Sequence, residues 1–311
     1  MAAAATTTTV EAKVAPRSAP KVSGVAQFAT AGLGGVLGWI VIHPFNTVAV
    51  RMNLSTGKGE KSFIKFTRKI VKDEGFKTLY KGLGAGITRQ IFYATSRFGL
   101  FEIFRDQMAK YRETDFLSRL VVGVASGACA AVVSCPAEVS LVRMSNDLAL
   151  PPERRRNYTS VANAAKRIVT EEGVTTFWRG SQPLMIRAAL VGATQVGTYD
   201  QFRDTFRKLG LKDETTNVLA SSSAAGLLYS LITMPFETAK NKMSSQQRDP
   251  VTGQLPYKST VQTIKSVAAS DGVVSLWKGF LPYYGRCGGH TVCMFFAVEK
   301  LRSLYIKYVL T

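Results

Sequence analysis

Two short sequence blocks each occur three times along the chain, always in the same order. The first block begins at a proline: PFNTVAVRM from Pro44, PAEVSLVRM from Pro136 and PFETAKNKM from Pro235. The second block ends at a glycine: EGFKTLYKG at Gly82, EGVTTFWRG at Gly180 and DGVVSLWKG at Gly279. A period of about one hundred residues indicates three structural repeats that bury their apolar surfaces against one another.

A stretch without Lys, Arg, Asp or Glu leads into each first block. These stretches are residues 22–50, 120–137 and 215–236. Their length suits helices that span a bilayer, which need roughly 20 residues. The chain carries a net charge of +19, and its basic residues crowd the segments that follow these stretches. Basic loops of this kind stay on the non-translocated side of a membrane, whereas a nucleic-acid-binding protein would gather its lysines on one soluble face.

The expected organisation is therefore an all-α membrane protein. We place a disordered N-terminal tail, rich in Ala, Thr and Pro, at residues 1–21. Three repeats follow at 22–112, 113–210 and 211–311. In each repeat the proline should kink the first long helix. An amphipathic stretch should then form a short helix at the membrane surface, and a second long helix should begin near the glycine.

The second helix of each repeat carries two layers of charge. Seven residues after each glycine stands an arginine: Arg89, Arg187 and Arg286. Further along are three acids, each followed by an arginine: Glu102 and Arg105, Asp200 and Arg203, Glu299 and Arg302. With a rise of 1.5 Å per residue, the two layers are roughly 20 Å apart. Because charges inside spanning helices mark solute pathways, we expect the first layer to bind substrate and the second to gate; purely structural pairing is the alternative.

Catalytic and metal-binding patterns are missing from the sequence. Its two histidines and four cysteines lack the spacing of a zinc site. It also has no Ser/His/Asp arrangement and no phosphate-binding loop. We therefore expect a transporter with no metal site, whose cysteines are buried free thiols.

The repeated blocks resemble the mitochondrial carrier family. Its repeat reads Pro-x-[Asp/Glu]-x-x-[Lys/Arg]-x-[Lys/Arg], then [Asp/Glu]-Gly-x4-aromatic-[Lys/Arg]-Gly, and the resemblance covers residues 22–308. It implies six transmembrane helices in a threefold pseudosymmetric bundle with short matrix surface helices, one central solute site and alternating access in the inner mitochondrial membrane. We expect a monomer that binds membrane lipid, with structural cardiolipin at the helix N-termini near Gly82, Gly180 and Gly279.

Three asymmetric stretches carry the resemblance further. RQIFYATSRFGLF, CPAEVSLVRM and YYGRCGGHTV resemble the members that exchange 2-oxoglutarate for malate. That resemblance assigns substrate contact to Arg89, Tyr93, Arg97, Arg187, Ala188, Arg286 and His290. Because guanidinium forks match planar carboxylates, we expect small dicarboxylate substrates. A broader dicarboxylate or oxodicarboxylate carrier and an uncoupling-protein relative are the alternatives, and Tyr93 and His290 could instead serve packing.

The first block departs from the family pattern at its ion-pair positions. The acidic position reads Asn46, Glu138 and Glu237, and the basic position reads Ala49, Leu141 and Lys240. In the family's pairing order only Glu138 with Lys240 is a complete pair, so we expect an incomplete matrix gate formed by Asn46, Glu138, Glu237 and Lys240. A modest bias toward the matrix-open state should follow, unless Arg51, Arg143 or Lys242 substitutes.

Overall fold

The computed structural model describes residues 24–55, 62–111, 115–211, 213–248, 253–306 and 308, and the regular structure in these ranges is helical. Six helices are long: α1 (Gly24–Leu54), α3 (Leu83–Ala109), α4 (Phe116–Asn146), α6 (Ser181–Lys208), α7 (Glu214–Ser245) and α9 (Phe280–Tyr305). Three are short: α2 (Phe63–Glu74), α5 (Val161–Arg167) and α8 (Thr260–Asp271). The tail predicted at 1–21 lies outside the described residues.

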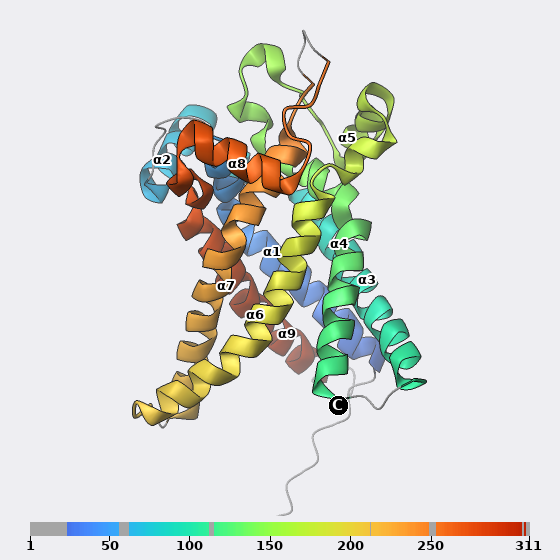
Figure 1. Cartoon of the computed structure of the whole chain (residues 1–311), viewed down its shortest axis with the longest axis vertical. Coiled ribbons are helices and arrows are strands. Elements are labelled where there is room, and N and C mark those ends of the chain that lie inside the picture. Colours follow the sequence, from blue (N-terminus) through green and yellow to red (C-terminus); the bar gives the residue numbers. More distant parts are fainter. Residues whose placement is uncertain are drawn as a thin grey trace, which may run out of the picture.

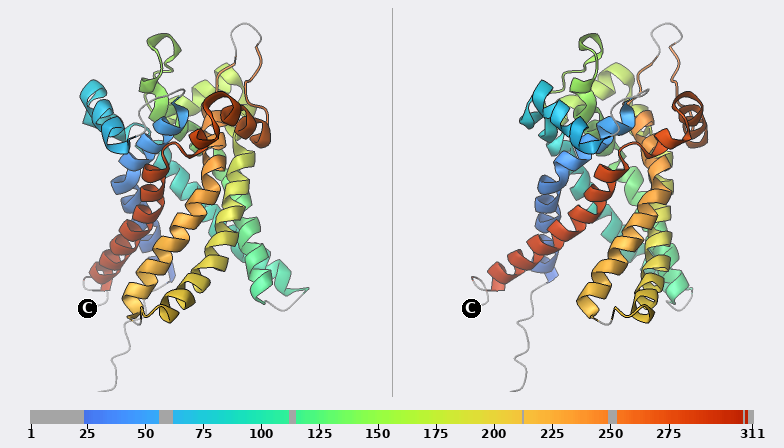
Figure 2. Two further views of the ribbon diagram at one scale, coloured as in Figure 1. Left: turned by 60° about the vertical axis from the view of Figure 1, so that its left-hand side comes forward. Right: turned by 90° about the vertical axis from the view of Figure 1, so that its left-hand side faces the viewer.

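The long helices form a bundle that is packed at one end and splayed at the other (Figures 1 and 2). The short helices α2, α5 and α8 lie at the packed end, which we call the capped end; the opposite end is the open end (Figure 1). The most extensive contacts join different repeats, because α1 packs along α9, α3 along α4 and α6 along α7. The three repeats therefore close into a ring, as their shared sequence pattern predicts.

Among the described residues, three helical segments are long and apolar enough to cross a membrane. They are Gly32–Leu54, Leu120–Ala149 and Thr216–Ser245, which overlap α1, α4 and α7. Pro44, Pro136 and Pro235 lie inside these helices. Each proline stands ten residues before the last residue of its helix (44 to 54, 136 to 146 and 235 to 245). The prolines therefore occupy equivalent places in the three repeats, while the kinks expected from them stay a prediction.

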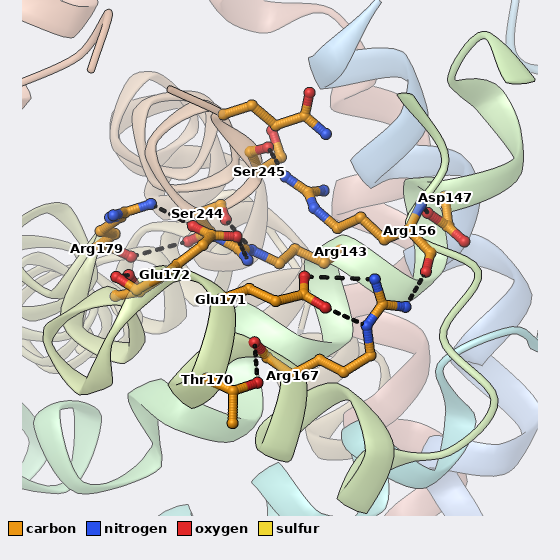
Figure 3. Close-up of polar contacts among 12 residues, drawn as sticks. Arg143, Asp147, Arg156, Arg167, Thr170, Glu171, Glu172, Arg179, Ser244 and Ser245 are labelled. Atoms are coloured by element: carbon orange, nitrogen blue, oxygen red, sulfur yellow. Dashed lines mark hydrogen bonds and ion pairs between the residues drawn. The ribbon is translucent and has the colours of Figure 1, made fainter. Parts of the chain in front are cut away.

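Arg143 links α4 to two other segments at the capped end (Figure 3). Its Nε donates to the carbonyl oxygen of Ser244 on α7 at 3.0 Å, and its Nη2 donates to Glu172 Oε2 at 3.0 Å. Arg179 donates to the same carboxylate at 2.6 Å. Burial raises the pKa of Glu172, but the hydrogen bond and charge of Arg143 outweigh this effect and hold that pKa below its usual value. Glu172 therefore remains charged.

The equivalent residues of the other repeats make similar links. Arg51 donates to Glu74 and to the carbonyl oxygen of Ser145, each at 2.8 Å. Lys242 donates to the carbonyl oxygen of Leu54 at 3.5 Å. Each side chain thus holds the end of a neighbouring repeat's helix. These partners are not the gate acids, and the hypothesis that the three cations replace the missing gate pairs stays a prediction.

Gly82, Gly180 and Gly279 precede the second long helix of each repeat in a left-handed backbone conformation. Their φ angles are 84°, 90° and 78°. A Cβ atom at Gly180 would lie 2.7 Å from Ser244 Oγ and 3.1 Å from the carbonyl oxygen of Lys240. Glycine is therefore required both by the turn and by the close approach of the neighbouring repeat. A role in lipid binding is a separate matter and stays a prediction.

Candidate functional site

A cavity of about 260 Å³ lies between α3, α4 and α6. Five of the seven predicted substrate contacts line it: Arg89, Tyr93 and Arg97 from α3, and Arg187 and Ala188 from α6. The wall formed by α4 includes Leu120 and Val124, has Glu138 at its end, and otherwise consists of small residues: Gly123, Gly127, Ala131 and Ser134. A Cβ atom at Gly123 or Gly127 would meet no other atom within 4 Å. These glycines therefore leave space for a solute.

The three arginines of the first charged layer all reach carboxylates of the predicted matrix gate. Arg89 Nε lies 3.4 Å from Glu138 Oε2, and Arg187 Nε lies 3.4 Å from Glu237 Oε2. Arg286 Nη2 lies 3.4 Å from Glu237 Oε1. All five side chains are largely buried. The sequence predicts the arginine layer and the matrix gate as two separate features. In the structure they form a single charge network.

Lys240 joins the two carboxylates of this network. Its Nζ donates to Glu138 and, at 2.8 Å, to Glu237. The pair of Glu138 with Lys240 that the sequence predicts is thus present. Asn46 accepts a hydrogen bond from Arg286 at 3.4 Å. We call these seven residues the capped-end network: Asn46, Arg89, Glu138, Arg187, Glu237, Lys240 and Arg286.

Glu237 is not left short of cations, although its expected partner position is Ala49. Lys240 of its own helix, Arg187 of α6 and Arg286 of α9 all lie within ion-pair distance. Arginines from the second helices thus compensate for the missing lysines of the first helices. The buried network closes the pathway at the capped end in this conformation. The predicted bias toward the matrix-open state stays a prediction.

Trp39 is a member of the site that symmetry reasoning missed. It is buried on α1, and the Cζ atom of Arg89 lies 4.5 Å from the centroid of its ring. A Cβ atom at Gly86 would lie 2.0 Å from Trp39 Nε1. The ring therefore fits against a glycine of α3 and presents its face to the guanidinium, an attractive cation–π arrangement. The only signal in the sequence is that the uncharged stretch of the first repeat contains a tryptophan, whereas those of the other two repeats do not.

The predicted substrate contacts that differ from repeat to repeat fall into two groups. Tyr93 and Arg97 lie together, with the Arg97 Cζ atom 5.9 Å from the centroid of the Tyr93 ring, and Arg97 is exposed. His290 on α9 does not line the cavity. Its Nε2 lies 3.3 Å from the carbonyl oxygen of Gly35, and its ring packs edge-on against Trp39 at 5.9 Å. These contacts favour the packing alternative for His290.

The second charged layer lies at the open end, where its members do not pair with one another. Five of the six side chains are exposed, and Arg203 is half-buried. Arg105 pairs with its neighbour Asp106 at 2.9 Å, and Arg203 pairs with Glu214. The splay of the helices separates the layer (Figure 2). The predicted ring of Glu102, Asp200 and Glu299 with Arg105, Arg203 and Arg302 is therefore not formed in this conformation, and its gating role in another conformation stays a prediction.

The described ranges contain no group of His, Cys, Asp and Glu residues that could hold a metal ion. No disulfide joins the four cysteines; Cys135 is buried, as predicted, whereas Cys287 and Cys293 are half-buried. The predicted burial is wrong for Cys129, which is exposed on α4. What the site offers is a cavity with fixed positive charge, closed at one end and flanked by splayed helices at the other.

Helices that close into a ring, three of which line a charged cavity, in a chain with bilayer-length apolar segments, define a membrane solute carrier. The sequence pattern of the family described as "Mitochondrial carrier protein" matches residues 20–112, 112–210 and 212–309. The chain belongs to the mitochondrial carrier family. It is accordingly a transporter and not an enzyme, and a multi-pass protein of the inner mitochondrial membrane.

Similar proteins cover nearly the whole chain. The "Mitochondrial 2-oxoglutarate/malate carrier protein" of Caenorhabditis elegans is 37% identical over 93% of this chain and 95% of its own length. The human protein of the same name is 36% identical over 95% of both chains. "Mitochondrial uncoupling protein 5" of Arabidopsis thaliana is 30% identical over 92% of this chain and 99% of its own length.

Proposed function

We propose that this carrier exchanges dicarboxylates, most readily 2-oxoglutarate for malate, by alternating access. The observation that carries the proposal is the pair of arginines, Arg89 and Arg187, on different helices around one cavity. Two guanidinium groups suit the two planar carboxylates of such a solute. The names of the relatives from Caenorhabditis elegans and human support the same substrates.

The proposed topology has all six long helices crossing the membrane as a threefold pseudosymmetric bundle. The charged layers of α3, α6 and α9 then face the pathway, where charge is tolerated. The capped end faces the matrix, because basic loops stay on the non-translocated side. The cavity is built by one chain, which supports function as a monomer.

Purified protein in liposomes tests this function. With malate inside, we expect uptake of labelled 2-oxoglutarate, and little uptake into liposomes without internal dicarboxylate. Succinate, malonate and oxaloacetate as internal solutes define the range of substrates. Absence of dicarboxylate uptake would contradict the proposal.

An uncoupling-type activity is the second candidate, supported by the similarity to the Arabidopsis protein. Proton conductance in the same liposomes distinguishes the two. The dicarboxylate proposal predicts 2-oxoglutarate exchange that does not depend on proton leak. Proton conductance without exchange would favour the second candidate.

We further propose that cardiolipin binds where the second helices begin. Near Gly180, an open cavity of about 410 Å³ is lined by Trp178, Arg179, Ser181 and Lys258, among others. Helix N-termini and nearby cations attract phosphate. Added cardiolipin should raise the unfolding temperature in detergent, and should raise it less for Lys258→Gln than for the control Lys265→Gln, whose side chain is exposed on α8. An unfolding temperature that cardiolipin leaves unchanged would count against this site.

A further inference from the structure

Asn46 occupies the one acidic position of the repeated block that carries no charge. It lies two residues after Pro44 and is 2% exposed, and its equivalents are Glu138 and Glu237. Its Oδ1 accepts a hydrogen bond from Arg286, whereas its Nδ2 has no partner among the described residues. Aspartate has the same shape as asparagine. The site could therefore hold a carboxylate here, yet the chain places a neutral amide.

The neutral amide leaves the capped-end network with an excess of positive charge. The network holds four cations, Arg89, Arg187, Arg286 and Lys240, and two carboxylates, Glu138 and Glu237. Four positive charges and two negative charges leave a net charge of +2. Arg97 lines the same cavity but is exposed, so water screens its charge and we leave it out of the count. An aspartate at position 46 would reduce the net charge to +1.

Excess charge of one sign is unfavourable where the groups are buried, because the interior screens charge poorly. A bound anion removes the excess only if its valence matches. A dicarboxylate carries two negative charges and makes the network neutral. A monocarboxylate leaves one positive charge uncompensated, and a tricarboxylate adds one negative charge too many.

We propose that Asn46 sets the valence of the transported anion, by holding the net charge of the capped-end network at +2. This inference rests on the proposed dicarboxylate exchange and adds a residue that determines its specificity. Asn46 acts through the charge balance around Arg286, so contact with the solute is not required. Arg286 contacts the carboxylate of Glu237 and the neutral amide of Asn46, so no third gate acid adds a negative charge beside it.

The test compares Asn46→Asp with the natural chain in liposomes. The probes are 2-oxoglutarate, with two carboxylates, and 2-oxopentanoate, which has the same chain length and one carboxylate. Inhibition constants of both are measured against malate exchange. We expect the preference for 2-oxoglutarate over 2-oxopentanoate to fall about tenfold or more in Asn46→Asp, because one unit of favourable charge is lost.

Matched variants separate charge from shape. Asn46→Leu keeps the net charge at +2, so its preference should equal that of the natural chain whatever happens to its rate. Adding Leu141→Lys to Asn46→Asp returns the net charge to +2 and should restore the preference. An unchanged preference in Asn46→Asp, or the same fall in Asn46→Leu, would overturn the inference.

Two further outcomes keep the test decisive. If Asn46→Asp does not fold, Leu141→Lys alone raises the net charge to +3 and should shift preference from 2-oxoglutarate toward citrate. A preference that does not move would again overturn the inference. Failure of the natural chain to exchange 2-oxoglutarate would instead refute the proposed function.

Discussion

Replacing Arg187 with alanine should reduce 2-oxoglutarate/malate exchange by at least about a hundredfold. The substitution removes a charge-assisted contact to substrate, worth about 1.5–3 kcal/mol. It also removes one of the cations that surround Glu237. Since each 1.4 kcal/mol is a factor of ten, the two losses together account for the expected reduction. Arg89→Ala and Arg286→Ala should behave similarly, because both arginines also contact a gate carboxylate.

The matched control for this prediction is Arg207→Ala. Arg207 lies on the same helix as Arg187 but is exposed and pairs with Glu214 at the surface. Exposed pairs of this kind contribute about 0–1 kcal/mol, so exchange should stay near that of the natural chain. Exchange rates are compared at equal amounts of folded protein, and thermal unfolding is used to determine the folded fraction of each variant. Near-normal exchange by all three site variants would refute the proposed binding site.

Much of the fold could be predicted from the sequence because its decisive features are local and repeated. A proline after an uncharged stretch marks each first helix, and a glycine marks the start of each second helix. Gly82, Gly180 and Gly279 do adopt the positive φ angles that glycine permits. Three copies of each signal, in the same order, left little freedom in the placement of the helices.

The candidate site was less predictable, because its geometry depends on how different helices converge. Spacing along one helix gives the level of Arg187, but not its approach to Glu237 of the next repeat. For the same reason, the sequence does not show that the arginine layer and the matrix gate form one charge network. At the open end, spacing predicts a ring of acid–arginine pairs but cannot show that the helices splay apart there (Figure 2).

Trp39 and His290 illustrate a second limit. Reasoning from repeats gives weight to positions that recur and overlooks residues that only one repeat contains. Trp39 is such a residue, yet it lies directly against Arg89. The resemblance predicts that His290 contacts substrate, but its ring meets Trp39 and the backbone of Gly35. The asymmetry of the site therefore emerges only when the helices are assembled.

Replacing Glu237 with glutamine should open the capped end and strongly destabilise this conformation. Glu237 is 2% exposed and lies within ion-pair distance of Lys240, Arg187 and Arg286. Neutralising it raises the net charge of the capped-end network from +2 to +3. Removing one partner of a buried ion pair costs about 3–5 kcal/mol, because the remaining charge is left uncompensated. We therefore expect a lower unfolding temperature in detergent and greater reactivity of a pathway cysteine, introduced at Ser134, toward a thiol reagent added from the matrix side.

Glu153→Gln is the control for this last prediction, because Glu153 lies at the capped end but is exposed. A surface change of this kind alters the free energy of unfolding by about 0.5 kcal/mol or less. Glu237→Gln and Glu153→Gln are compared in a protein whose four natural cysteines have been replaced, so that the thiol reagent reacts only with the cysteine introduced at Ser134. If Glu237→Gln unfolds at the same temperature as Glu153→Gln and the thiol reacts no faster, the buried ion pairs do not hold the capped end closed. Reduced stability together with faster labelling would identify Glu237 as the centre of that closure.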